Sequence, residues 1–311
     1  MKYVYLLFLT LSVNACLPPL PGGVQTVGFE FANPANTSSP EQEKRLFAVL
    51  EARLTAFYDH PIQLQKVADN DYEMRIPGQI NENLLSLLIG SPGRLFFAET
   101  LPGEAAAQAF RAAGLDEKFA HKLQYAEQNP FPQDPVIGYA LPRDSAAISA
   151  EIKRAALLGI IPGELSHAWG QVPIAKTYEK AAYVPLYAIR KVEGRYQGVK
   201  GKSIIRAKAE ADQIGKWSIM MSFDESGTQE WAAMTADRVN DFIAMLIDGK
   251  AWSVPRVNSP IPGGQAMLSA DFEQMYAETW AAILQGGQLP AAIRMTKLNF
   301  DPAVNFKDGS P

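Results

Sequence analysis

The chain has 311 residues, 47% apolar and 20% charged, a composition typical of a folded protein with a real core and not of a disordered one. Its formal net charge of −4 argues against a nucleic-acid-binding protein, which needs a basic surface to neutralise phosphates. The length corresponds to about two average domains, and the expected partner is protein, lipid or a small molecule.

The N-terminus has the pattern of an export signal. Lys2 is followed by the uncharged run Tyr3–Ala15, which is too short to span a bilayer, and then by the only cysteine of the chain. The last four of these residues resemble the lipobox of bacterial lipoproteins: Val13, Asn14, Ala15 and Cys16. We therefore predict a lipoprotein signal peptide over residues 1–16, with Cys16 as the lipid anchor of a protein in the cell envelope that faces the periplasm. The alternative is cleavage by ordinary signal peptidase after Ala15, which would leave a free thiol.

The Pro-Gly-rich segment 17–23 is predicted to be a tether, and residues 24–99 then alternate between strand and helix patterns. The expected order is strand 24–31, helix 41–58, strands 62–67 and 72–76 around the turn ADND, helix 81–90 and a closing strand 94–99. One apolar stripe marks the first helix: Leu46, Val49, Leu50, Leu54 and Phe57. This order predicts a ferredoxin-like antiparallel sheet with two helices on one face, which we call the base.

Residues 100–270 are predicted to form an inserted α+β head subdomain with an irregular insertion. Helices are expected near GEAAAQAFRAAG and DSAAISAEIKRAALLG, and strands near AYVPLYAIRK. After Lys216 come strand KWSIMMSF, a helix capped by Asp224, strand DFIAMLI, a hairpin, strand GQAMLS, a helix capped by Asp271 and ended by Gly286, and strand LPAAIRMTKL. The closing helix and strand, residues 271–300, belong to base or head, and residues 301–311 form a flexible tail.

The segment IDGKAWSVPRVNSPIPGG, from Ile247 to Gly264, predicts a hairpin, because Asp248 and Gly249 both tolerate the positive φ of a type I′ turn. Pro255 cannot donate to a sheet and belongs on an edge. In an alternating strand, Trp252 shares a face with Val254 and Arg256, so these three are the candidate client-binding residues. A core position for Trp252, packed on the helix after Asp271, remains the alternative.

No catalytic, metal or cofactor motif is complete. Gly201, Lys202 and Ser203 end like a phosphate loop, but Tyr196 stands where the first glycine belongs. The calcium-like DNDYEMRIPGQI has Met74 at the glycine position and Ile80 at the bidentate position. We therefore expect no enzyme activity, no cofactor and no metal, and a binding or structural role; an enzyme of unknown type is the least favoured hypothesis.

The stretch from Trp217 to Ile293 resembles the P1 domain of SecD, the extracytoplasmic part of the SecDF protein-export motor. The first unit is similar to the P1 base through LEARLTAF, the strand into IPG at Ile76–Gly78 and GRLFF, and the middle of the chain is weakly similar through PLYAIRK. The matching positions in the main stretch are Phe223, Asp224, Gly227, Thr235, Asp248, Gly249, Ser253, Pro255, Ile261, Gly263, Gly264, Gly287, Leu289 and Pro290.

The resemblance implies a base that carries a mobile head, and the expected partners of the head are unfolded or translocating protein chains or Sec translocase components. In SecD the segment after the Leu-Pro pair leads into transmembrane helices that use the proton gradient; here 21 residues follow Pro290, so we expect no proton-driven motor. The hairpin is then scaffold whose exposed strand could accept an extended peptide. The alternative is an envelope lipoprotein of the same fold that binds a peptide or other small ligand.

Overall fold

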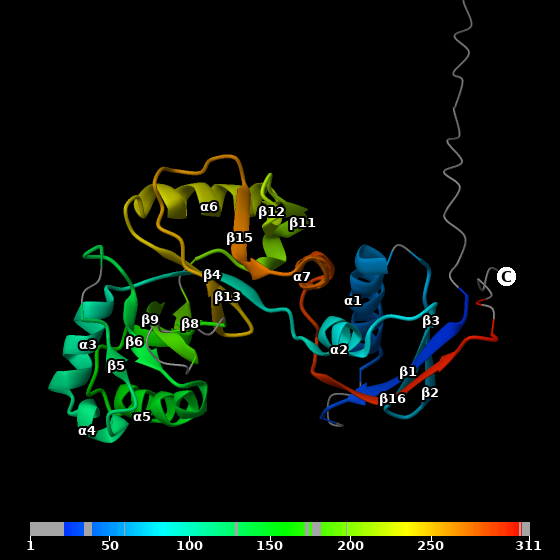
Figure 1. Cartoon of the computed structure of the whole chain (residues 1–311), viewed down its shortest axis with the longest axis horizontal. Coiled ribbons are helices and arrows are strands. Elements are labelled where there is room, and N and C mark those ends of the chain that lie inside the picture. Colours follow the sequence, from blue (N-terminus) through cyan, green and yellow to red (C-terminus); the bar gives the residue numbers. More distant parts are fainter. Residues whose placement is uncertain are drawn as a thin grey trace, which may run out of the picture.

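The computed structural model describes residues 22–33, 39–58, 60–127, 130–171, 174–175, 182–196, 198–304 and 306. Cys16, the predicted signal peptide and most of the predicted tether lie outside the described residues. Figure 1 shows a base at one side of the molecule and, joined to it, a head and an insert that lie on the other side. The first and last described strands, β1 and β16, lie side by side in the base.

The base is built on a four-stranded antiparallel sheet with the order β16-β1-β3-β2. Its strands are β1 (Val24–Phe31), β2 (Gln63–Ala68), β3 (Asp71–Pro77) and β16 (Ile293–Asp301). Alternate residues of β1 and β3 are fully buried against the helices, and the Phe29 and Tyr72 rings stack with centroids 5.4 Å apart. The order and the helices on one face confirm the predicted α+β fold with a ferredoxin-like sheet.

The strand expected to close this sheet is elsewhere. β4 (Leu95–Glu99) pairs along its whole length with β13 of the head, and β16 occupies the position beside β1. β4 is covered on both faces, because its residues Leu95, Phe97 and Ala98 are buried. Its apolar sequence pattern therefore does not indicate which sheet the strand joins. The expectation that residues 94–99 close the base is wrong, because the chain closes that sheet only after it has passed through the head.

Three helices cover the base sheet or lie beside it: α1 (Pro40–Tyr58), α2 (Glu82–Gly90) and α7 (Gln274–Gly286). The predicted cap of α7 is wrong, because β15 continues through Phe272 and Glu273 is the N-cap residue. Pairing of Trp217 with Phe272 beyond a bulge keeps this segment extended. The predicted end at Gly286 is confirmed, and Gly287 follows with φ of 82°.

The head contains two three-stranded antiparallel sheets, ordered β11-β12-β15 and β14-β13-β4. Its elements are β11 (Ile204–Ala211), β12 (Trp217–Phe223), α6 (Glu225–Asp237), β13 (Ile243–Ile247), β14 (Lys250–Ser253) and β15 (Gln265–Phe272). Asp224 caps α6 as predicted: its Oδ1 accepts the Gly227 N–H at 2.7 Å. Trp231 of α6 packs on Phe97 and Phe223, which joins the helix to both sheets.

The insert carries its own sheet, with the path β10-β9-β6-β5 and with β7 and β8 also paired to β9. Its elements are α3 (Gly103–Ala112), α4 (Leu115–Phe119), β5 (Gln124–Tyr125), β6 (Val136–Ala140), α5 (Ser145–Leu157), β7 (Leu165–Trp169), β8 (Ile174–Ala175), β9 (Ala182–Val192) and β10 (Arg195–Tyr196). Short 3-10 helices span Pro142–Asp144 and Gly201–Ser203. In the described part of the chain, no helix combines the length and apolarity needed to cross a membrane.

Candidate functional site: the head and its junctions

The predicted hairpin is present. Asp248 and Gly249 have φ of 52° and 82°, and β13 and β14 pair antiparallel on either side of them. The Asp248 carboxylate also accepts the backbone N–H groups of Gly93 and Arg94, at 3.3 and 2.9 Å. The turn is therefore bound to the segment that leads from the base into the head.

The three candidate client-binding residues do not share one face. The Trp252 ring stacks on Phe272 at 5.7 Å and meets Trp280 of α7 edge-on at 4.6 Å, whereas Val254 packs with a different apolar cluster. Regular pairing of β14 ends at Ser253, and a bulge lies opposite Met245 and Leu246. The bulge changes which side chains of β14 point to each face of the sheet. Trp252 thus takes the core-like position that was the alternative.

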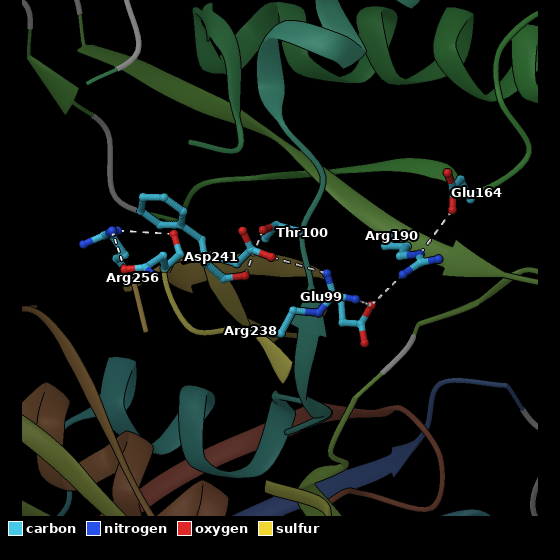
Figure 2. Close-up of polar contacts among 9 residues, drawn as sticks. Glu99, Thr100, Glu164, Arg190, Arg238, Asp241 and Arg256 are labelled. Carbon is cyan, nitrogen blue, oxygen red and sulfur yellow. Dashed lines mark hydrogen bonds and ion pairs between the residues drawn. The ribbon is translucent and has the colours of Figure 1, made fainter. Parts of the chain in front are cut away.

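Arg256 lies beyond the regular strand and is already engaged. Its Nη2 donates to Asn240 Oδ1 at 2.7 Å, its Nε donates to Asn240 O at 3.2 Å, and its guanidinium lies 4.7 Å from the Phe131 ring centroid. These contacts connect the hairpin to the insert. Figure 2 shows Arg256 on one side of the polar contacts at this junction.

The outer edge of β14 is partly occupied. Gly170 forms a parallel bridge with Ala251, and the Gln171 N–H donates to the Ala251 carbonyl at 2.8 Å. Pro255 is exposed, and its carbonyl accepts the Ile243 N–H at 3.1 Å. At Ala251, therefore, an added peptide would have to displace the insert.

The two motif glycines after the hairpin differ in their surroundings. Gly264 has φ of 64°, and a Cβ on it would lie 2.2 Å from Thr228 Oγ1, so a side chain there meets both strain and α6. Gly263 has open space around its Cα. Of these two glycines, only Gly264 has a steric requirement for glycine.

One face of the β11-β12-β15 sheet is largely open to solvent. We call it the head-sheet face; its residues are Arg206, Lys208, Glu210, Ser218, Met220, Ser222, Gln265, Met267 and Ser269. Its middle row runs Lys208–Met220–Met267, because residues opposite each other in antiparallel pairs lie on the same face. The face therefore combines two flexible methionines with a polar and charged border.

β15 presents a short free edge beside this face. The Phe223 N–H donates to Gly264 O, which makes Phe223 and Gly264 a hydrogen-bonded pair of the antiparallel ladder. Hydrogen-bonded and non-bonded pairs alternate along such a ladder, so the backbone N–H and C=O groups of Gln265, Met267 and Ser269 point away from β12. The Trp231 indole N–H occupies the Gln265 carbonyl at 3.0 Å. On the opposite edge, the Gln285 carboxamide bonds to Ala207 N–H and Ile205 O of β11. Each edge is thus blocked at one end by a side chain.

Glu99 joins the head to the insert. Its carboxylate lies between Arg190 of β9, at 3.2 Å, and Arg238 at the end of α6 (Figure 2). Arg190 continues to Glu164 at 3.2 Å, and Arg238 to Asp241 at 3.5 Å. Neighbouring Thr100 donates to the Phe242 carbonyl at 2.8 Å. This chain of opposite charges holds β4, β9 and α6 together.

Arg53 joins the base to the head. Its side chain is fully buried, and its five hydrogen bonds go to four backbone carbonyls, those of Leu88, Ser91, Pro92 and Gly287. Burial lowers the pKa of Arg53 to about 10, and the Asp248 charge opposes that shift. Leu88, Ser91 and Pro92 lie where the chain leaves the base for the head, and Gly287 lies where it returns to the base. The Arg53 guanidinium therefore binds both segments that cross between base and head.

A cleft of about 890 Å³ opens beside these crossings. Its charged lining residues are Arg45, Arg94, Lys200, Lys202 and Asp248, so four cations face one acid. Tyr196, Leu289 and Pro290 supply apolar surface. We call it the base–head cleft; its size and lining fit a ligand more readily than a reaction centre.

The described residues contain no group of three or more His, Cys, Asp or Glu side chains placed to hold a metal ion. Of the histidines, His60 contacts the Tyr58 ring, and His167 hydrogen-bonds to Ser149 in the insert. Sequence reasoning missed Arg53 and Glu99. Arg53 did carry a signal, because it lies three residues after Leu50 on the apolar stripe of α1, where a charge is unusual.

Comparison with known proteins agrees with this architecture. Residues 187–291 match the family model of the SecDF P1 head subdomain. The protein translocase subunit SecD of Acidaminococcus fermentans is 37% identical over 97 residues, which cover 31% of this chain and 23% of that protein. SecD of Rhodothermus marinus is 25% identical over 168 residues, 54% of this chain and 26% of that protein. The matched segments thus span about a quarter of these relatives.

Two solved structures share the fold. A crystal structure of SecDF in the super-membrane-facing form aligns with 92% of this chain and 32% of that one, with a TM-score of 0.54 and 16% identity. A second structure, of SecDF as a membrane component that enhances protein export, aligns with 88% of this chain and 99% of that one, with a TM-score of 0.51 and 16% identity.

The fold and the matched segment define a domain related to protein export. More narrowly, the chain is similar to the P1 region of SecD, and the head subdomain accounts for the strongest part of that similarity. The resemblance found in the sequence is confirmed.

Proposed function

We propose that this protein is a lipid-anchored, periplasm-facing SecD P1-like protein that binds unfolded or translocating protein, or docks on the Sec export machinery, by binding and not by catalysis. The observation that carries the proposal is the head subdomain match over residues 187–291, on a fold shared with SecDF. The relatives are protein translocase subunits, which handle protein chains as cargo.

We place client contact on the head-sheet face and the free edge of β15. A client without fixed sequence needs backbone pairing and adaptable apolar contact, and methionine supplies the latter because its side chain is flexible and polarizable. Met267 is 52% exposed, and its backbone N–H and C=O point away from β12 and have no strand partner among the described residues. The free edge is short, so affinity should be weak, about micromolar or poorer.

Photocrosslinking in cells tests this surface. A photoreactive residue at Met267 should capture translocating chains, whereas the same residue at Val67 should capture few. Val67 is the matched control because it is 57% exposed on β2, an edge strand of the base. Equal capture from both positions, or none from Met267, would place client contact elsewhere or refute it.

The anchor has a separate test. Acylation at Cys16 adds several chains, each buried methylene contributing about 0.8 kcal/mol, so membrane attachment should survive high salt and yield to detergent. Cys16→Ala should release or misprocess the protein. Wild-type protein that stays soluble without detergent would contradict the lipoprotein assignment and leave the client surface unaffected.

The base–head cleft favours a second candidate, an envelope protein of the same fold that binds a peptide or cell-wall fragment. Its four cations would select an anionic ligand. Titration with anionic cell-wall fragments and with an unfolded client chain separates the two functions. Under this candidate Lys202→Gln weakens fragment binding and Met267→Ser changes nothing, whereas the leading proposal expects Met267→Ser to weaken client binding.

A further inference from the structure

A second cleft, of about 400 Å³, lies in the insert between α5 and β7. Four residues of α5 at helical spacing line one wall: Ser149, Ile152, Lys153 and Ala156. His167 and Trp169 of β7 and Lys191 of β9 line the other side, and Tyr196 lies between this cleft and the base–head cleft. We call it the insert pocket.

Two lysines line the insert pocket, and no described residue supplies a counter-charge to either of them. Neither Lys153 nor Lys191 forms an ion pair with another described residue, and no Asp or Glu is among the lining residues. The Lys191 Nζ lies 4.3 Å from the Tyr196 ring centroid. Burial, and then the Lys153 charge, lower the pKa of Lys191. Lys153 is exposed and Lys191 is half-buried, and their charges are close enough to repel each other at the cleft.

A hydrogen-bonded group fixes the wall beside them. Ser149 Oγ accepts the Trp169 indole N–H at 2.8 Å and also lies 2.8 Å from His167 Nε2. Burial, and then the Lys153 and Lys191 charges, together lower the pKa of His167 to about 4. The imidazole is thus neutral at pH 7, and the described residues that line the pocket supply two positive charges and no negative one.

We propose that the insert pocket binds the phosphate group of a small phosphorylated molecule, with the Lys153 and Lys191 ammonium groups as its two charged donors. A phosphate dianion matches the two unpaired charges, whereas a carboxylate would neutralise only one of them. The volume accommodates the phosphate and a small organic body. This site is separate from the head-sheet face and does not depend on the proposed function.

NMR of the histidine side chains tests the proposal, because the chain has only three histidines and His60 and His121 lie outside the pocket. The full protein is titrated with inorganic phosphate and with glycerol phosphate, with sodium chloride holding the ionic strength constant. The His167 resonances should shift and saturate with a dissociation constant of about 1 mM, while those of His60 and His121 stay in place.

Lys153→Gln and Lys191→Gln should each weaken this binding at least tenfold, and Lys118→Gln, at an exposed lysine of α4, should not. Unchanged His60 and His121 signals show that a variant is folded. The proposal is overturned if His167 responds neither to these two phosphates nor to phosphatidic-acid vesicles, if the two lysine variants titrate like wild type, or if acetate binds as tightly as phosphate. A response only to phosphatidic-acid vesicles supports the phosphate site and identifies a lipid headgroup as its source.

Discussion

Arg53 and Glu99 each join distant segments of the chain, but they use different partners. Arg53 is fully buried, has no carboxylate bonded to it, and donates to four backbone carbonyls at the two crossings between base and head. Glu99 is a fifth exposed, at 19%, and attracts two arginines that join the head to the insert. One junction depends on backbone geometry and the other on charge.

The difference matters for how the parts can move. The Leu88 carbonyl is buried and would be left without a hydrogen-bond donor if Arg53 moved away, so the base–head junction resists opening. Ion pairs at a partly exposed junction can exchange their partners for water and ions at little cost. We therefore expect the insert to separate from the head more readily than the head from the base.

Arg53→Met should have the largest effect, a loss of about 4 kcal/mol in the free energy of unfolding, because four backbone carbonyls lose their hydrogen bonds to a fully buried guanidinium. Urea unfolding measures it. Arg53→Lys is the matched control: it keeps the charge but cannot reach all four carbonyls, so its loss should be intermediate. A loss below about 1 kcal/mol for Arg53→Met would mean that the crossings do not depend on this residue.

Trp252→Ala should be next, a loss of about 3 kcal/mol, because its ring packs on Phe272 and on Trp280 of α7. Trp252→Phe keeps part of this contact and should cost less than half as much. If Trp252→Ala leaves stability unchanged and lowers client crosslinking, Trp252 is a contact residue and the sequence-based assignment stands.

The elements were largely predictable from sequence and their partners were not. The helix beginning at the Asp224 cap and the turn at Asp248–Gly249 follow from local chemistry, and both are present. β4 was assigned to the wrong sheet, because a strand buried on both faces carries no local mark of its partner. Arg53 and Glu99 meet partners far away in the chain, which single-sequence patterns do not reveal.

His167, unlike Arg53 and Glu99, is a buried side chain that stays neutral. Its pKa is lowered to about 4 by burial and by Lys153 and Lys191, so the unfolded chain binds a proton between about pH 6.5 and 4 and the folded chain does not. Stability should therefore fall as pH falls through this window, by about 3 kcal/mol from this group. His167→Gln, which can still bond to Ser149, should remove that part of the slope.

The measurement is unfolding by urea at pH 7, 5.5 and 4, with His60→Gln as the control outside the insert pocket. The difference between the two variants removes the contribution of carboxylates that titrate in the same pH range. A His167→Gln profile parallel to that of His60→Gln would contradict a depressed pKa at His167. A pocket filled by phosphate should flatten the wild-type slope, because a bound dianion favours the charged imidazole.

Glu99→Gln should have the smallest effect, a loss of about 1 kcal/mol at low salt that shrinks as salt is added, because the amide keeps the shape and removes the charge between Arg190 and Arg238. Glu164→Gln is the matched control, since Glu164 pairs with Arg190 alone and is 49% exposed, so its loss should be within about 0.5 kcal/mol. Hydrogen exchange should report faster opening of β9 in Glu99→Gln, with β1 and β3 unchanged. Equal protection of β9 in both variants would mean that packing, and not this ion pair, holds the insert to the head.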